Sequence, residues 1–324
     1  MNNDKKMLSI VLASYYSGDR ARLCYEKLGQ LLEAEKIPFE LIVMDDGSKD
    51  DSYVNALKLE KAHENVRAYR LSRNYGSFYS TFAGLSLCRG ACAMPICDDE
   101  QQPYQTVVDM YRLWERGHKI IIPFRKSRAD SKIRSFLSNA FYWVMNSLSE
   151  VRYPPGGADT FFLDREVLDI LTTQIHPRNT STIAEVLRLG FDPYFYEYER
   201  PLGLNKNKSR WTLRKKIRLA KDNFFSASTF PIKAISIMGA IAFGLSVLMG
   251  TFYTYIVAFG NKTFWGRPVP GWTSIVVLIF AFGGLILLSL SMIAEYIWRI
   301  YEEVKARPGY IIRSKEGEST DGVD

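Results

Sequence analysis

The chain has 324 residues, of which 47% are hydrophobic and 24% charged, so it is neither disordered nor collagen-like and can form more than one domain. Its formal net charge of +7 favours anionic partners: nucleic acid, a lipid surface or phosphorylated small molecules. The four cysteines lack the ligand pairs of a zinc site, so we expect reduced, buried thiols.

Residues 1 to about 200 alternate between strand-like and helix-like segments. This alternation predicts an α/β domain with a mostly parallel sheet and helices on both faces. Ligands of such sheets bind beyond the carboxyl ends of the strands, where Asp45-Asp46 and Asp98-Asp99 follow two apolar runs. The strands are expected over 8–15, 39–48, 66–72 and 90–99, and the helices over 20–35, 52–63 and 77–88.

Three polar motifs stand at the ends of these strands. In VMDDGSKDDS, Gly47 permits a tight turn and Ser48 can cap the next helix, which explains the turn without a ligand, although either aspartate could accept hydrogen bonds from a base or ribose. LSRNYGSFYSTFAGL places Arg73 before a helix start, which suits a nucleotide or phosphate. In ICDDEQQP, three adjacent carboxylates need positive charge nearby, from a metal, a cationic ligand group or solvent.

Two long windows near the C-terminus carry no charged side chain. No Asp, Glu, Lys, Arg or His lies between Lys233 and Lys262, or between Arg267 and Glu295. Each window exceeds the roughly 20 apolar residues that span a bilayer, so we expect two transmembrane helices joined by a short link. The expected spans cover about 233–259 and 269–294.

The distribution of basic residues predicts the orientation of these helices. Nine basic side chains lie between 206 and 233 and five follow Glu295, whereas the link has only Lys262 and Arg267. The positive-inside rule therefore places both termini in the cytoplasm. The expected domains are a cytoplasmic domain over 1–205, a basic amphipathic juxtamembrane segment over 206–232, the two membrane helices over 233–297 and a cytoplasmic tail over 298–324.

Taken together, the motifs resemble the family 2 glycosyltransferases, and more narrowly their polyprenyl-phosphate glycosyltransferase branch. This resemblance implies that 1–205 is a catalytic domain of the GT-A (Rossmann-like) fold. Two residues depart from the family pattern: Cys97 stands at the first Asp of its Asp-x-Asp motif, and Glu100 at a hydrophobic position. The resemblance covers DDGSKD (45–50), SRNYGSFYSTFAGL, DDEQQP (98–103), PFRKSRAD (123–130), GGADTFFLDREVLDIL (156–171), 208–239, both windows and 295–312.

The resemblance also implies roles for individual residues. The implied catalytic residues are Asp99, Gln101 and Asp159, with Asp99 also the ligand of a divalent cation, Mg²⁺ or Mn²⁺. The implied donor-binding residues are Asp45, Asp46, Arg73, Asp98, Arg125 and Arg128, and the implied ligands of the acceptor phosphate are Arg200, Lys208 and Arg210. Asp164, which precedes an apolar periodic run, is expected to be a helix cap instead.

The implied activity is inverting transfer of a sugar from a nucleotide-sugar donor to a polyprenyl phosphate at the cytoplasmic membrane, for modification of a cell-envelope glycan. The partners are then the donor, the lipid acceptor and the bilayer, without nucleic acid, and a homo-oligomer is compatible with them. The alternative is a processive polysaccharide synthase, but NKSRW (207–211) has only the final Arg-Trp of its acceptor motif. A transporter of the lipid-linked sugar and an inactive nucleotide-sugar-binding protein are further alternatives.

The expected topology can be tested with reporter fusions. A reporter fused after Asp324 should be cytoplasmic, and one inserted at Asn261, in the link, should lie on the opposite side, because the basic residues flank the pair of windows. Enzymatic activity of compartment-specific reporters measures this. Both reporters on one side would exclude the helical hairpin.

Overall fold

The computed structural model describes residues 6–98, 102–125, 153–154, 158, 160–175, 182–199, 230–259, 263–264, 267–268, 271–305 and 307–313. The chain forms two compact units, which are described separately. The first contains Met1–Ala227 and Pro308–Asp324, and the second contains Ser228–Arg307.

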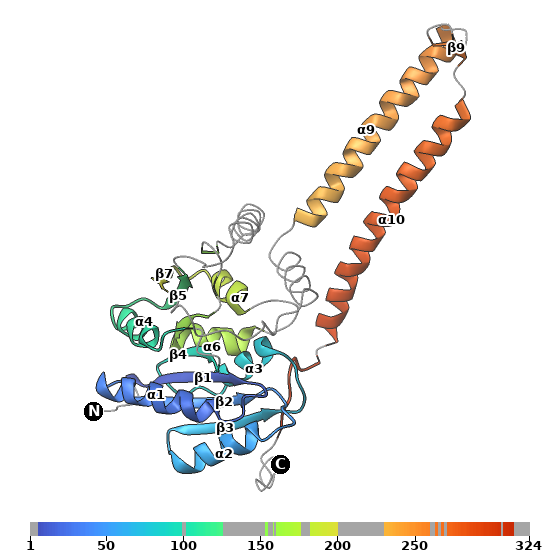
Figure 1. The fold of residues 1–324 in the computed structure, drawn as a ribbon. Coiled ribbons are helices and arrows are strands. Elements are labelled where there is room, and N and C mark those ends of the chain that lie inside the picture. Colours follow the sequence, from blue (N-terminus) through green and yellow to red (C-terminus); the bar gives the residue numbers. More distant parts are fainter. Residues whose placement is uncertain are drawn as a thin grey trace. The chain divides into compact units, whose positions relative to one another are not determined.

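The first unit is built on one mixed sheet (Figure 1). The strand order is β10-β3-β2-β1-β4-β6-β5-β7, and the pairing is parallel except at β6 and β10. The predicted α/β class with a mostly parallel sheet is therefore confirmed. The strands are β1 (Leu8–Ser14), β2 (Phe39–Asp45), β3 (Val66–Leu71), β4 (Cys92–Cys97), β5 (Ile120–Arg125), β6 (Phe162–Asp164), β7 (Pro193–Tyr198) and β10 (Ile312–Arg313).

Helices cover both faces of this sheet (Figure 1). The alternation of β1 shows why: Leu8, Ile10 and Leu12 point to one face, and Val11 points to the other. On the first face the core is completed by α1 (Arg20–Ala34), α2 (Ser52–Ala62) and α4 (Gln105–Glu115), and on the second by α3 (Ser77–Leu85), α6 (Arg165–Gln174) and α7 (Thr182–Arg188).

The cap predicted at Asp164 is also confirmed. Its side chain accepts a hydrogen bond from the backbone N–H of Glu166 at 3.0 Å, at the start of α6. Another oxygen of the same carboxylate accepts from Nε1 of Trp114 at 2.7 Å. Asp164 thus joins α4 to α6, and each of its carboxylate oxygens accepts a hydrogen bond within the fold.

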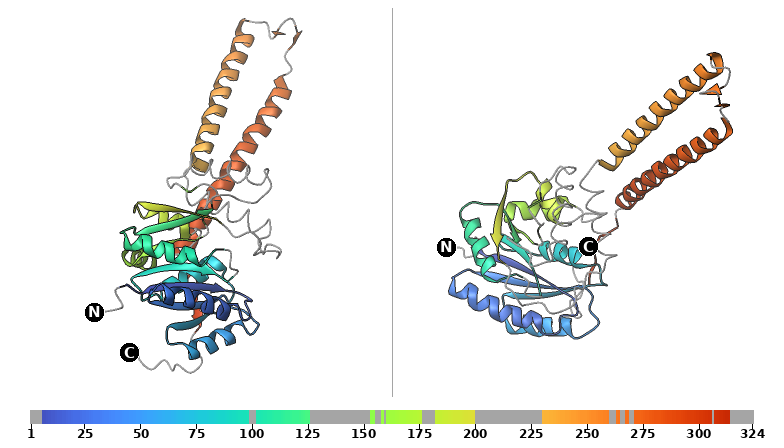
Figure 2. Two further views of the ribbon diagram at one scale, coloured as in Figure 1. Left: turned by 60° about the vertical axis from the view of Figure 1, so that its left-hand side comes forward. Right: turned by 45° about the horizontal axis from the view of Figure 1, so that its top comes forward.

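The second unit contains two long helices, α9 (Phe230–Phe259) and α10 (Gly271–Val304), which run antiparallel side by side (Figures 1 and 2). Between them are two short paired strands, β8 (Thr263–Phe264) and β9 (Arg267–Pro268). Within the described residues one helical window, Ala281–Trp298, has the length and hydropathy of a membrane span, with a mean hydropathy of 1.6. The two expected helices are therefore present as α9 and α10, and the window that meets these criteria among the described residues lies in α10.

Two glycines inside helices provide a matched test of packing. A Cβ atom at Gly84 of α3 would lie 2.2 Å from Cγ1 of Val11, whereas one at Gly29 of α1 would approach Cζ of Phe39 to only 3.7 Å. Gly84→Ala should therefore overpack the contact with β1 and lower the free energy of unfolding by about 1–3 kcal/mol. Gly29→Ala should be neutral or raise it by about 0.5–1 kcal/mol, because alanine favours helix. Thermal unfolding of the full chain in detergent, followed by circular dichroism, measures both, and equal effects would contradict this packing.

Candidate active site

The sheet has its topological switch point between β1 and β4. The chain passes from β1 to β2 and β3 on one side, and β4 lies on the other side of β1. Ligands of open α/β sheets bind beyond the carboxyl ends of strands at such a point. The residues that follow β1, β2, β3 and β4 therefore define the candidate site.

Asp46, directly after β2, holds the loop that follows β3. Its two carboxylate oxygens accept hydrogen bonds from the backbone N–H groups of Tyr75 and Gly76, each at 2.8 Å. Gly76 has a φ of +99°, which disfavours any residue with a Cβ, and it precedes the first residue of α3. Asp46, which is buried, thus fixes the shape of residues 72–76, called loop 72–76 below.

Asp45 forms a second turn beside the first. Its carboxylate accepts from the backbone N–H of Ser48 at 3.0 Å and from the Ser48 hydroxyl, and Nε of Arg70 lies 3.4 Å away. A Cβ atom at Gly47 would lie 2.5 Å from the carbonyl carbon of Arg73, so only glycine allows this turn to pack against loop 72–76. The two turns therefore support each other.

The loop after β1 is the part of the site that sequence reasoning missed. The rings of Tyr15 and Tyr16 meet edge to face at 4.6 Å, and both are partly exposed, at 36% and 42%. Tyr16 has a φ of +50°, which is uncommon for a residue other than glycine, and its N–H donates to Oγ of Ser48 at 3.0 Å. Two adjacent aromatic residues directly after a buried strand were the available sequence signal.

Asp98, directly after β4, is tied to the same loop. One carboxylate oxygen, Oδ2, accepts from the hydroxyl of Ser17 and lies 3.5 Å from Nη1 of Arg20. Ser17 Oγ also accepts from the backbone N–H of Tyr15 at 3.1 Å. The carboxylate therefore faces the switch point across β1 and β4.

Burial raises the pKa of both Asp45 and Asp46 above the ordinary value of 3.8. Hydrogen bonds from Ser48 and the charge of Arg70 act in the opposite direction at Asp45, as do the two backbone N–H groups at Asp46. The ionised carboxylates are thus costly in the free protein, because water has been removed from them. Ligand groups that donate hydrogen bonds or carry positive charge would be favoured here.

The structure brings four of the predicted donor-binding residues to one edge of the sheet. Asp45 ends β2, and Asp46, Arg73 and Asp98 follow β2, β3 and β4. The guanidinium of Arg73 lies 4.5 Å from the ring centre of Tyr75. Arg125 ends β5, which runs parallel to β4, so its backbone reaches the same edge. Outside the described residues lie Asp99, Gln101, Arg128, Asp159, Arg200, Lys208 and Arg210, and their roles stay predictions.

The described side chains of the site supply only part of the coordination that a hard divalent cation needs. Among the residues that the structure describes, no group of three or more His, Cys, Asp or Glu side chains could hold a metal ion. Asp98 supplies an oxygen ligand of the type that Mg²⁺ and Mn²⁺ prefer. Further ligands would have to come from Asp99 or from the phosphates of a donor.

The four cysteine thiols differ in their exposure to solvent. All four cysteines are thiols outside any disulfide, and Cys24, Cys88 and Cys92 are buried as expected. The expectation of burial is wrong for Cys97, which is exposed because it is the last residue of β4, where the strand reaches the site. Burial raises the pKa of Cys88 to about 12, so this thiol stays protonated and unreactive.

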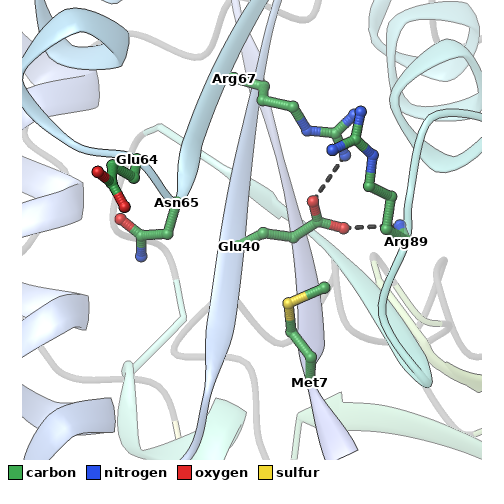
Figure 3. A pocket seen from close by; sticks show the side chains of 6 residues that line it. All are labelled: Met7, Glu40, Glu64, Asn65, Arg67 and Arg89. Atoms are coloured by element: carbon green, nitrogen blue, oxygen red, sulfur yellow. Dashed lines mark hydrogen bonds and ion pairs between the residues drawn. The ribbon is translucent and has the colours of Figure 1, made fainter. Parts of the chain in front are cut away.

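A cavity of about 530 Å³ lies at the opposite, amino-terminal edge of the sheet. Its lining includes Glu40, which accepts from Arg67 Nη2 at 2.6 Å and from the backbone N–H of Arg89 at 2.7 Å (Figure 3). Ser9 Oγ donates to the same carboxylate at 2.5 Å. These groups satisfy one another, so the polar groups around Glu40 are accounted for by the fold without a ligand. The lining residues are Met7, Glu40, Glu64, Asn65, Arg67 and Arg89.

Comparison with known proteins identifies the family to which this chain belongs. Residues 9–174 match the glycosyl transferase family 2, so the chain belongs to this family and is a glycosyltransferase. An uncharacterized glycosyltransferase of Synechocystis is 30% identical over 307 residues, 94% of each chain. The bactoprenol glucosyl transferase of Shigella phage SfX is 28% identical over 317 residues, 95% of this chain and 99% of that one. Mannosyl-3-phosphoglycerate synthase from Rubrobacter xylanophilus is 17% identical with a TM-score of 0.46, over 67% of this chain and 71% of that one.

The double hydrogen bond of Asp46 can be tested by one substitution. Asp46→Asn places an NH₂ group opposite a backbone N–H, so one bond is lost and two donors meet; we expect a loss of about 1–3 kcal/mol in stability and weaker donor binding. Asp51→Asn is the matched control, because Asp51 is exposed and makes no side-chain cap bond. Thermal unfolding and equilibrium donor binding measure both variants. A stable Asp46→Asn chain with wild-type donor affinity would exclude this role.

Proposed function

We propose that this glycosyltransferase moves a sugar from a nucleotide-sugar donor to a polyprenyl phosphate at the cytoplasmic face of a membrane. The observation that carries the proposal is the extent of the match to the bactoprenol glucosyl transferase of Shigella phage SfX, which covers 95% of this chain. The match must therefore extend beyond the family domain of residues 9–174 into the part of the chain that contains α9 and α10. A transferase with a soluble acceptor would not need these helices.

The donor is proposed to bind at the carboxyl edge beside the switch point. Asp45 and Asp46 are proposed to accept hydrogen bonds from the base and ribose, since each carboxylate oxygen has two lone pairs and can accept a second donor. The exposed rings of Tyr15 and Tyr16 offer a stacking surface for the base. Arg73, Arg125 and Arg128 are proposed to bind the donor phosphates, for which guanidinium groups are suited.

The acceptor needs no general base. A polyprenyl phosphate is already anionic near pH 7, by analogy with phosphoamino acids whose second pKa is roughly 6. Its oxygen would form a bond to the anomeric carbon as the bond from that carbon to the nucleoside diphosphate breaks, with inversion. The protein's task is then to bring two anionic groups together, and Arg200, Lys208 and Arg210 are proposed to neutralise the acceptor phosphate while Gln101 and Asp159 orient the reacting groups.

A divalent cation, Mg²⁺ or Mn²⁺, is proposed to accompany the donor. Asp99 is its proposed ligand, with Asp98 nearby at the end of β4. The cation would offset the charge of the donor diphosphate during transfer. Cys97 is not proposed as a ligand, because thiolates suit softer metals.

The membrane location is proposed for both helices of the second unit. Large apolar side chains on α9 and α10 are exposed, among them Leu248, Phe259 and Leu287, which a bilayer would cover. The basic segment 206–232 is proposed to lie among the lipid headgroups on the cytoplasmic side. Both termini would then share that side, as the positive-inside rule predicts.

The direct test is transfer by the purified full chain in detergent, with undecaprenyl phosphate and a panel of nucleotide sugars. We expect a lipid-linked sugar from one donor of the panel and no requirement for a further protein. Release of free sugar alone, or extension of a polysaccharide, would overturn the proposed acceptor.

Three variants at the end of β4 test the proposed cation ligand. Asp99→Asn keeps the shape but removes the charge, so it should abolish transfer and metal-dependent donor binding. Cys97→Ser should leave most activity, and Cys97→Asp should be tolerated and bind the metal at least as tightly. The transfer rate against manganese concentration measures all three. An inactive Cys97→Ser chain beside an active Asp99→Asn chain would point to thiolate chemistry instead.

A further inference from the structure

The chain that follows α10 adds a strand to the sheet of the first unit. β10 (Ile312–Arg313) pairs antiparallel with the end of β3, where Ile312 lies opposite Leu71. The pairing continues one residue past β3, because the backbone N–H of Ser72 donates to the carbonyl oxygen of Ile311 at 2.9 Å. It therefore holds the backbone at the point where loop 72–76 begins.

Side chains of the same segment anchor it from one face. Tyr310 and Ile312 pack against a buried apolar cluster that joins β2, β3 and α3. The hydroxyl of Tyr310 lies 3.3 Å from Oγ of Ser86, directly after α3. A strand of two residues gains little from its backbone alone, so these side-chain contacts account for its position. The buried cluster consists of Met44, Leu71 and Ala83.

This cluster lies directly beneath the donor side of the candidate site. Met44 precedes Asp45, and Leu71 is the last residue of β3 before loop 72–76. Tyr75, whose N–H donates to Asp46, packs against the same cluster as Tyr310 and Ile312. Loop 72–76 and the segment 310–313 therefore pack against the same apolar cluster. Loss of the segment would remove some of the side chains that cover this cluster beside the loop.

We propose that residues 310–313 are a positioning element for loop 72–76, so that affinity for the nucleotide-sugar depends on the chain that follows α10. The identity of the ligand rests on the proposed function. The physical reason is population: a loop that adopts its binding geometry for only a fraction of the time lowers the apparent affinity by that fraction. Tyr310 and Ile312 would act through the loop and are not proposed to contact the donor or the acceptor.

Hydrogen exchange of the full chain tests the positioning without any donor. Ile312→Ala should speed exchange of the Tyr75 and Gly76 amides about five- to tenfold, because opening of the loop becomes less costly. Tyr310→Phe keeps the ring and should have a smaller effect of about two- to threefold, which keeps the test valid if Ile312→Ala folds poorly. Ile311→Ala is the matched control, because residue 311 is 50% exposed and the substitution keeps the backbone carbonyl that accepts from Ser72; it should leave exchange unchanged.

Steady-state kinetics then test the link to the donor. Ile312→Ala should raise the KM for the nucleotide-sugar about five- to tenfold, with kcat and the KM for the lipid changed less than about twofold. Unchanged exchange in both variants, or an equal rise in the KM for the lipid, would overturn the proposal. If the wild-type chain transfers no sugar, the proposed function fails, and the exchange measurement still decides whether 310–313 positions the loop.

Discussion

Two backbone N–H groups on one buried carboxylate, that of Asp46, set the shape of the candidate site. An ionised carboxylate without water is stable only when it is well supplied with hydrogen-bond donors, and Tyr75 and Gly76 provide them. The same two bonds fix the residues that lead into α3. They also place loop 72–76 where Gly47 can pack against its backbone. The position of Arg73 depends on this arrangement.

From Asp46 the hydrogen bonds continue across the carboxyl edge of the sheet. Asp46 joins β2 to loop 72–76, Ser48 joins the turn of Asp45 to Tyr16 after β1, and Ser17 joins this loop to Asp98 after β4. Four strand ends are thus connected in order by side-chain contacts. A polar network in which each member has a partner rigidifies its surroundings, and a rigid edge lowers the cost of orienting a ligand.

Much of this fold could be predicted from the sequence, because the relevant signals are local. Short apolar runs marked β1 to β4, and the rule for parallel sheets placed Asp45, Asp46 and Asp98 at one edge. The strand β6 lies within DTFFLDR (159–165), which can be read as a strand with a polar end, whereas the two residues of β10 offered too few positions for a periodic pattern. The partners of the aspartates could not be predicted either, since Tyr75 is 29 residues from Asp46 and only the folded chain brings its backbone N–H to the Asp46 carboxylate. The exposure of Cys97 depends on where β4 ends, which its apolar sequence did not show.

The ion pair of Glu40 lies at the other end of the same strands, and this separation has an evolutionary consequence. Glu40 binds Ser9, Arg67 and the backbone of Arg89, and so it ties together β1, β2, β3 and the turn before β4. Loss of Glu40 would leave the partly buried Arg67 without its counter-charge, which would lower the free energy of unfolding. Selection for thermal tolerance can therefore act on the amino-terminal edge while selection on the proposed donor site acts on the carboxyl-terminal edge, and a change at one edge need not compromise the other.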